Sequence, residues 1–196
     1  MRYLISGVLT GAVLGFFCTS AASDTGLYGV PAPADAIFVR WIGKGTPWEL
    51  PLWGISFEGQ DLPANTYVAI SASAFTEVGP GGYYSVIEGQ ENRLIILPEP
   101  PRERTSRVHL LLLNTGPAFA ALTVSGSGLE VIGGIAPMSA GTRAVNPVSA
   151  SLRVETPQDS QDFDVALRRG QNISFVVLED QIMMIQNTFG PVAEIR

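Results

Sequence analysis

Cysteine is almost absent from this chain of 196 residues, in which Cys18 is the single example. Two phenylalanines precede Cys18, where a lipoprotein signal needs small residues, so we expect no lipid anchor there. Without a second thiol the chain forms no internal disulfide and no cysteine-rich zinc site. Its stability must therefore come from the burial of apolar side chains.

Histidine is equally scarce, and His109 lies in the middle of a strand-like run of Val and Leu. Acyl-transfer enzymes need a nucleophile, a base within hydrogen-bond reach and an oxyanion hole. The sequence contains neither a Gly-x-Ser-x-Gly segment nor a Gly-Asp-Ser block. Asp159, Asp162 and Asp164 lack the glycine and the terminal glutamate of a calcium loop. The sequence thus predicts no catalytic residue, no metal site and no cofactor.

Positive charge is also limited, because 12 Lys and Arg face 18 Asp and Glu for a net charge of −6. Nucleic-acid binding depends on Lys and Arg at phosphates, so we expect no nucleic-acid partner. The net negative charge also repels an acidic polysaccharide at long range. Contact with such a polymer must then be local or made mainly by partner proteins.

The N-terminus has the layout of a secretory signal peptide. Arg2 precedes an apolar run from Leu4 to Phe17, and small residues follow. The run is shorter than the roughly 20 residues that span a bilayer. We expect residues 1–23 to be removed by cleavage near Ala22 or Ser23 and the mature chain to be exported, with an uncleaved anchor as the alternative.

Strands are predicted along most of the mature chain, because Gly and Pro recur and apolar residues alternate with polar ones or form short β-branched runs. The expected strands are Ile37–Trp41, Trp53–Phe57, Tyr67–Ser71, Tyr83–Ile87, Leu94–Leu97, Val108–Leu113, Ala120–Val124, Leu129–Ile132, Val148–Glu155, Val165–Arg168, Ile173–Leu178 and Ile182–Gln186. A short helix over Asp159–Arg169 is a competing interpretation of that segment. Ser125–Gly128 is expected to be a hairpin turn.

A segment with three prolines and four charged residues, Pro98–Arg104, interrupts the strand pattern. Prolines remove backbone donors and charges resist burial, so the segment is interpreted as a linker. We expect an all-β protein of two tandem small antiparallel β-sandwich domains, residues 24–98 and 107–196, joined by a Pro-rich linker at 99–106. A single larger sandwich is the alternative.

Several short blocks of the mature chain share order and spacing with a known family. They are Gly26–Pro33 leading into Ile37–Trp41, Pro80–Tyr84, Pro98–Pro101, Arg143–Val148 with the strand that follows it, and Leu167–Gly170. Together they resemble the AlgF family of alginate biosynthesis proteins across nearly the whole mature chain.

The resemblance implies a periplasmic protein of tandem β-sandwiches that acts in the O-acetylation of mannuronate residues in alginate, an exopolysaccharide of biofilms. Its partners would be a membrane O-acyltransferase and SGNH-type acetyltransferases, and alginate itself is a further candidate. Because the chain offers no nucleophile–base pair, we expect a non-catalytic accessory or adaptor protein. A module that binds the uronate polymer is the alternative, and an acetyltransferase proper is disfavoured.

Four residues are candidates for contact with a partner or glycan. Arg40 and Arg143 offer charges for acidic groups, although a local ion pair or backbone bond is the competing interpretation. Tyr83 and Tyr84 are adjacent, so one must point away from the core in a regular strand and is open to sugar stacking. Within the family blocks, Tyr28 is expected to pin the entry strand, and Asn146 and Pro147 to form a turn.

Overall fold

The computed structural model describes residues 31–43, 48, 51–76, 78–88, 94–102 and 106–195. The expected signal peptide, its cleavage sites and Tyr28 lie outside these residues. The described part contains thirteen β-strands and one short 3₁₀ turn, Ala72–Ala74. None of its helices has the length and apolarity to cross a membrane. The expected all-β fold of two tandem β units is confirmed.

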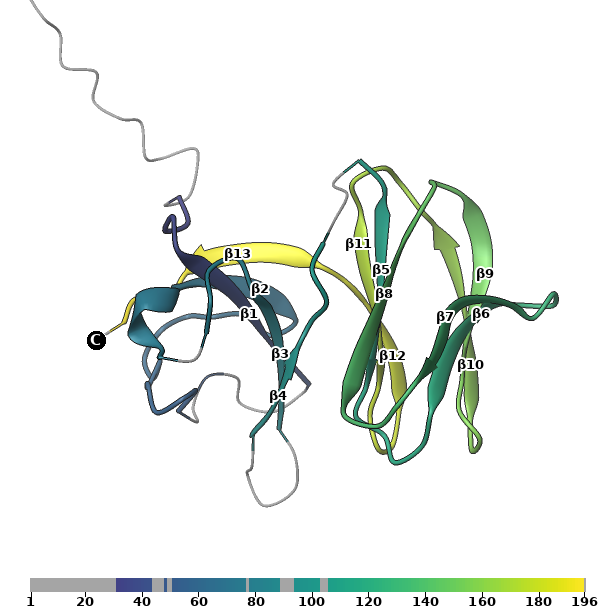
Figure 1. Ribbon diagram of the computed structural model, residues 1–196, viewed down its shortest axis with the longest axis horizontal. Helices are drawn as coiled ribbons and strands as arrows, with labels where there is room; N and C mark the ends of the chain where they lie inside the picture. The colour runs from purple at the N-terminus through teal and green to yellow at the C-terminus, as the bar shows by residue number, and fades with distance from the viewer. Residues whose placement is uncertain are drawn as a thin grey trace, which may run out of the picture.

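The first unit is built on one five-stranded sheet in the order β13-β2-β1-β3-β4 (Figure 1). Its strands are β1 (Ala36–Ile42), β2 (Thr66–Ser71), β3 (Tyr83–Glu88), β4 (Leu94–Pro98) and β13 (Thr188–Val192). β1 runs parallel to β3, and β13 runs parallel to β2, so the sheet is mixed, in contrast to the antiparallel pairing that we expected.

The second unit is a sandwich of two four-stranded sheets, β10-β9-β6-β7 and β12-β11-β5-β8. Its strands are β5 (Val108–Asn114), β6 (Ala120–Val124), β7 (Leu129–Ile135), β8 (Ser139–Val145), β9 (Ser149–Glu155), β10 (Ser160–Ala166), β11 (Asn172–Val177) and β12 (Ile182–Gln186). All pairs are antiparallel except β5 with β11, which are parallel.

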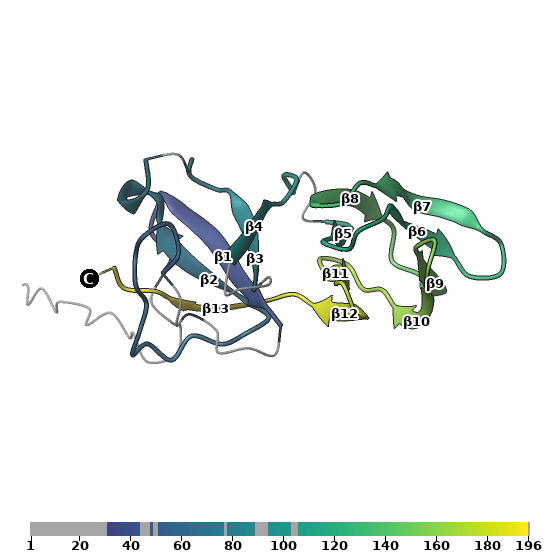
Figure 2. The same cartoon turned by 90° about the horizontal axis from the view of Figure 1, so that it is seen from below.

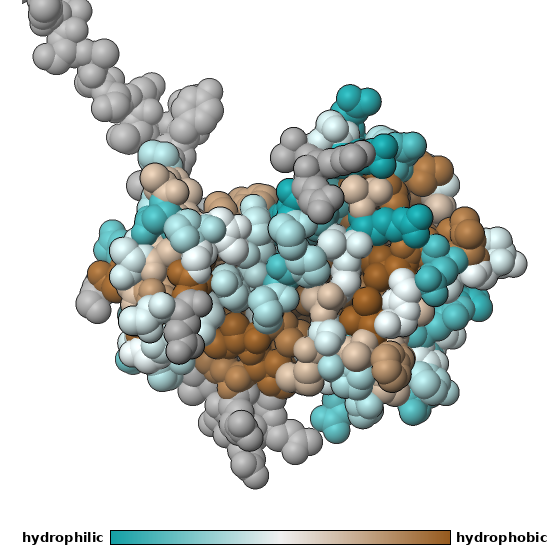
Figure 3. Space-filling model, in the orientation of Figure 1, coloured by the Kyte–Doolittle hydropathy of each residue, from teal (hydrophilic) through white to brown (hydrophobic). Residues whose placement is uncertain are grey.

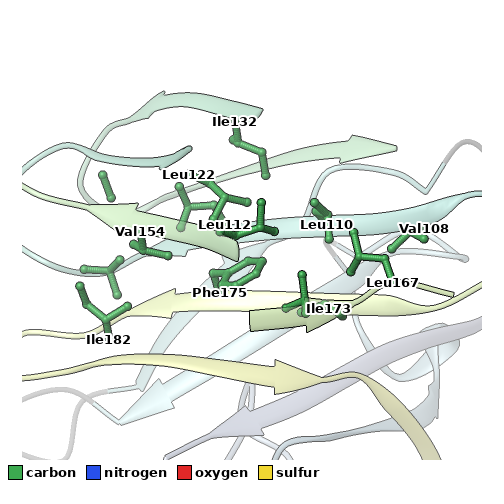
Figure 4. Close-up of a cluster of buried hydrophobic side chains, with 14 residues drawn as sticks. Val108, Leu110, Leu112, Leu122, Ile132, Val154, Leu167, Ile173, Phe175 and Ile182 are labelled. Carbon is green, nitrogen blue, oxygen red and sulfur yellow. The ribbon is translucent and has the colours of Figure 1, made fainter. Parts of the chain in front are cut away.

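The sandwich core lies between these two sheets, and alternate residues of each strand fill it (Figure 4). Leu110 and Leu112 from β5 and Phe175 from β11 face Leu122 from β6 and Val154 from β9. This is the period-two burial that a sandwich requires, and it confirms the half-buried alternation expected for the strand ending at Glu155.

The core of the first unit lies on one face of its sheet. Trp41 from β1 packs there with Trp48 and Phe57, which belong to the strand-poor segment that covers this face. Trp53 adopts a left-handed conformation with φ of 49°, and Leu52 and Ile55 form only an isolated bridge. The strand expected at Trp53–Phe57 is therefore wrong, because a turn interrupts it.

The opposite face of the first sheet packs against the β12-β11-β5-β8 sheet of the sandwich, so the molecule has three successive β layers (Figure 2). Ile42 and Ile87 of the first sheet share a buried cluster with Leu111 and Leu113 of β5 and Val176 of β11. All seven residues of β5 are buried as a result, because both of its faces are covered.

The last strand returns to the first unit. After β12 ends in the sandwich, β13 crosses back and pairs with β2 at the edge of the first sheet (Figure 2). The sequence predicts that residues 107–196 form the C-terminal domain, whereas residues 188–192 pair with the N-terminal sheet. The chain thus passes between the units twice, at residues 99–107 and at Asn187.

Two predicted strands, Ala120–Val124 and Ile182–Gln186, are confirmed with the same first and last residues. The Ser125–Gly128 turn is also present, with Gly126 and Gly128 at positive φ. The competing helix at Asp159–Arg169 is wrong, because β10 occupies Ser160–Ala166 and pairs with all of β9. The strand expected at Val165–Arg168 begins five residues earlier and ends at Ala166.

Candidate functional site

A buried polar network lies between the first sheet and the sandwich, and Arg40 is at its centre. Alternation along β1 directs Arg40 away from the core of the first unit and toward the sandwich, with 0% of the residue exposed. Its guanidinium donates to Ser85 Oγ at 2.9 Å, to Glu99 Oε1 at 3.2 Å and to Asn187 Oδ1. The last contact links the first sheet to the residue between β12 and β13.

Glu99 provides the negative charge of this network. Its carboxylate accepts hydrogen bonds from the Tyr67 hydroxyl, at 2.8 and 2.6 Å, and from Ser85 Oγ at 2.6 Å, besides the bond from Arg40. Its side chain is 1% exposed. The expectation that the charged residues of this segment resist burial is therefore wrong at Glu99, because arginine, tyrosine and serine donors replace water around the charge.

Arg102 lies against a group of aromatic rings beside the network. Its Cζ atom is 3.9 Å from the ring centre of Tyr83 and 4.7 Å from that of Tyr67, and its Nη2 is 3.5 Å from Glu99 Oε2. Burial raises the pKa of the Tyr67 hydroxyl far above its ordinary value, so this group stays a proton donor to Glu99. Cation–π contact and the ion pair together fix the orientation of the Arg102 guanidinium.

A groove of about 370 Å³ opens next to Arg102, at the junction of the two units. The side chains that give it chemical character are Tyr83, Arg102, Arg107, His109, Asn172 and Phe189. Phe189 from β13 is 53% exposed and stacks on Tyr67 with 5.5 Å between ring centres. The groove therefore combines two guanidinium groups, an imidazole and an exposed aromatic ring.

His109 is the second residue of β5 and is almost fully buried. Its Nε2 is 2.9 Å from Thr142 Oγ1, and that hydroxyl donates its one proton to the Leu110 carbonyl oxygen at 2.9 Å. The imidazole therefore donates to Thr142, which is not placed as an activated nucleophile. Burial, with a further contribution from Arg102 that Glu99 opposes, lowers the pKa of His109. The ring is neutral at pH 7.

The four residues that the sequence proposed for contact with a partner or glycan lie in different environments. Tyr83 lines the groove, whereas Tyr84 points to the other face of the sheet, where its ring meets that of Trp53 at 5.3 Å. Arg40 is enclosed in the network, so it reaches no partner directly. Arg143 is exposed on β8 and donates to the Val131 carbonyl oxygen at 2.9 Å.

Asn146 and Pro147 are exposed in the connection between β8 and β9, and the chain bends at Pro147. The sequence predicts a turn at these two residues. The groove residues that the sequence did not single out are Arg102, Arg107, Asn172 and Phe189. Their only sequence signal is that Arg102 lies within the proline-rich segment and Arg107 follows it closely. Asn172 and Phe189 come from strands far away in the chain.

The acidic cluster at Asp159, Asp162 and Asp164 has no metal-binding arrangement, and no group of three or more His, Cys, Asp or Glu among the described residues does. Asp162 is paired with Arg153, whose Nη2 is 2.7 Å from Asp162 Oδ2. Hydrogen bonds from Arg153 and from Ser125 lower the pKa of Asp162 to about 2. This surface pair contributes little to stability, as is typical of exposed ion pairs.

Comparison with known proteins gives one relative with a descriptive name. Over 182 residues the chain is 26% identical to the alginate biosynthesis protein AlgF of Pseudomonas aeruginosa, a match that covers 84% of this chain and 83% of the relative. No protein-family model matches the chain. Among solved structures, the C-terminal domain of AlgF from P. aeruginosa aligns at 18% identity and a TM-score of 0.38, over 41% of this chain and 98% of that domain. The N-terminal domain of the same protein aligns at 15% identity and a TM-score of 0.33, over 43% of this chain and 98% of that domain.

Proposed function

We propose that this chain is an AlgF-like accessory protein of alginate biosynthesis, which acts without catalysis of its own in the O-acetylation of the polymer in the periplasm. The observation that carries the proposal is the similarity to AlgF, which extends over most of both chains. The blocks of residues that resemble the family lie in both β units, which agrees with similarity along the whole length.

The geometry around His109 supports a role without catalysis. The imidazole is almost fully buried and hydrogen-bonded to Thr142, whose proton is donated to a backbone carbonyl. Acyl transfer through a side-chain nucleophile needs a hydroxyl or thiol whose proton the base can accept. The acetyl chemistry would then belong to partners, which we propose to be an SGNH-type acetyltransferase and a membrane O-acyltransferase.

The architecture supports an adaptor. Two β units that share a buried apolar cluster and a buried polar network present their surfaces in a fixed relation to each other. An adaptor benefits from this arrangement, because surfaces that are already positioned bind without a large entropic cost of ordering. Uronate binding is the second candidate, and the arginines of the groove favour it locally.

The test is binding of the exported chain, residues 24–196, to a periplasmic SGNH-type acetyltransferase of the proposed pathway, with mannuronate oligomers titrated in parallel. We expect saturable binding to the enzyme. Binding to the oligomers alone would replace the adaptor by the glycan module. Hydrolysis of a model acetyl ester at a rate that His109→Gln abolishes would overturn the non-catalytic role.

A further inference from the structure

The groove at the junction of the units concentrates positive charge in an acidic protein. Arg102 and Arg107 line it, and none of the described residues that line it is Asp or Glu. Glu99, the nearest carboxylate of the network, already accepts bonds from Arg40, Tyr67 and Ser85. Among the described residues, the positive charge of the groove therefore exceeds what Glu99 neutralises, and an anion is the ligand that matches it.

Arg107 is the residue that is open to such a ligand. It is half-buried beside the groove, and within the described part of the chain its side chain has no hydrogen bond or ion pair. A guanidinium presents paired donors that match the two oxygens of a carboxylate. A partly desolvated arginine whose side chain has no partner among the described residues is therefore a favourable place for one carboxylate to bind.

The aromatic residues of the groove indicate which carboxylate-bearing molecule fits. The Arg102 guanidinium covers the face of Tyr83 at 3.9 Å, so that ring is not free to stack on a sugar. Phe189 is exposed at the same groove and offers a purely apolar surface. Arginine, tyrosine and phenylalanine around a small cavity are typical of protein–protein contact sites, in which a few buried groups supply most of the affinity.

We propose that this groove binds a short acidic segment of a partner protein, with a carboxylate on Arg107 and a neighbouring apolar side chain against Phe189. The volume of about 370 Å³ is at the lower end of the range for ligand pockets and suits one or two side chains of an extended segment. The proposal rests on the accessory function above and adds the surface that would carry it.

A second hollow adjoins the groove at Gly170, which lines both. Arg168 and Arg169 line this hollow together with one acidic residue, Asp164. The positive charge thus continues along the turn between β10 and β11. An acidic segment longer than the groove would find further arginines in this direction, so affinity should rise with the number of carboxylates and fall with added salt.

His109 provides a direct way to observe binding, because it is the one histidine of the chain and lines the groove. Its imidazole is hydrogen-bonded to Thr142 of β8 and shares the groove with Arg102, and the charges of Arg102 and Glu99 affect its pKa in opposite directions. In the exported chain without an affinity tag, the Cε1–H signal in a proton–carbon NMR spectrum belongs to His109 alone. A carboxylate bound nearby stabilises the imidazolium, so binding should both shift this signal and raise the pKa of His109.

The titration uses the tetrapeptide Glu-Leu-Glu-Glu, blocked at both ends, at about pH 7 and low ionic strength. The isosteric Gln-Leu-Gln-Gln peptide is the neutral control, and mannuronate oligomers form a separate arm. We expect a saturable shift with the acidic peptide alone. Arg107→Gln should weaken binding about tenfold, the effect of one charge-assisted hydrogen bond, and Arg107→Lys should restore part of it. Arg153→Gln removes an equal charge on β9, outside the groove, and should bind as the wild type does.

Equal shifts with both peptides, or equal affinity in Arg107→Gln and wild type, would overturn the proposal. A response to the oligomers without one to the peptide would assign the groove to the glycan instead. If the intact acetyltransferase binds wild type and Arg107→Gln alike, the groove proposal falls while the accessory function stands. If the enzyme does not bind at all, the accessory function is refuted, and the peptide titration still shows whether the groove binds an acidic segment. If Arg107→Gln lowers the unfolding midpoint, Arg107→Lys takes its place: it keeps the charge but loses the paired donors, so it should bind more weakly than the wild type, and equal affinity would overturn the proposal.

Discussion

Replacement of Glu99 by glutamine should destabilise the protein severely although the two side chains have nearly the same shape. The Glu99 carboxylate accepts hydrogen bonds from three groups, Arg40, Ser85 and Tyr67, and it is the counter-charge of the fully buried Arg40. The amide of glutamine is neutral and directs an NH₂ group at these donors. Loss of one partner from a buried ion pair costs about 3–5 kcal/mol, because the remaining charge is left uncompensated.

Urea denaturation measures this effect. With an m-value of about 2 kcal/mol/M, a loss of about 3–5 kcal/mol lowers the urea midpoint by about 1.5–2.5 M. The three tryptophans, Trp41, Trp48 and Trp53, all belong to the first unit, so fluorescence follows that unit while far-UV circular dichroism follows both. We expect the two transitions to coincide in the wild type and to separate in Glu99→Gln, because the network joins the units.

Two further variants decide whether a buried charge is the cause. Glu130→Gln makes the same chemical change at an exposed position on β7 and should leave the free energy of unfolding within about 0.5 kcal/mol of the wild type. The double variant Arg40→Met with Glu99→Leu removes both charges and should be more stable than Glu99→Gln alone. A loss below about 1 kcal/mol in Glu99→Gln, or a double variant less stable than the single one, would refute the reasoning.

Three other outcomes are expected. The pKa of His109 is lower in the folded state than its unfolded value of 6.5, so the unfolded chain binds the proton more readily and stability should fall as the pH drops below about 6.5. His109→Gln should flatten that part of a plot of urea midpoint against pH. An unchanged slope in the variant would contradict this prediction. Leu112→Ala in the sandwich core should cost about 2–5 kcal/mol in thermal or urea unfolding followed by circular dichroism, and a cost below 1 kcal/mol would show that the core closes around the gap. Deletion of residues 188–196 removes β13 from the edge of the first sheet and should lower the tryptophan-fluorescence midpoint, which would stay unchanged if β13 were peripheral.

Much of the sandwich could be predicted from the sequence, because its signals are local. Alternating apolar residues identified β9, and β-branched runs flanked by turn residues identified β6 and β12 at their full lengths. The adjacent tyrosines were expected to face opposite sides, and Tyr83 and Tyr84 do so. Each of these inferences depends on a repeat of two residues, which the strand geometry itself imposes.

The strands that the sequence did not predict, β8 and β13, lack the alternation of apolar and polar residues. β8 consists of small and polar residues, and it forms because β5 pairs with it along its whole length. Gly141 within β8 lies so close to β7 that an added Cβ atom would be 2.4 Å from Ile135 Cδ1, so a larger and more strand-like residue does not fit there. β13 contains Gly190 and Pro191, which oppose a strand in general, yet proline is tolerated at a sheet edge where its missing N–H is not needed.

The site was less predictable than the fold, because its members are brought together from distant parts of the chain. Arg40 and Asn187 are 147 positions apart and hydrogen-bonded, and no spacing rule connects them. The expectation that Glu99 resists burial in a linker follows from composition, which cannot show that donors from Arg40, Tyr67 and Ser85 converge on one carboxylate. Phe189 reaches the groove only because the last strand returns to the first sheet.

The buried network and the open groove have different consequences for function although they share Arg102. Glu99 lies at one side of the Arg102 guanidinium, and the guanidinium lies over the ring face of Tyr83. The network therefore fixes the orientation of Arg102, which lines the groove, before any ligand binds. A ligand then binds without a large entropic cost of ordering this side chain. Glu99→Gln should therefore weaken peptide binding as well as stability, whereas Arg107→Gln should weaken binding alone. Equal peptide affinity in Glu99→Gln and wild type, under conditions where both are folded, would show that the groove holds its shape independently of the network.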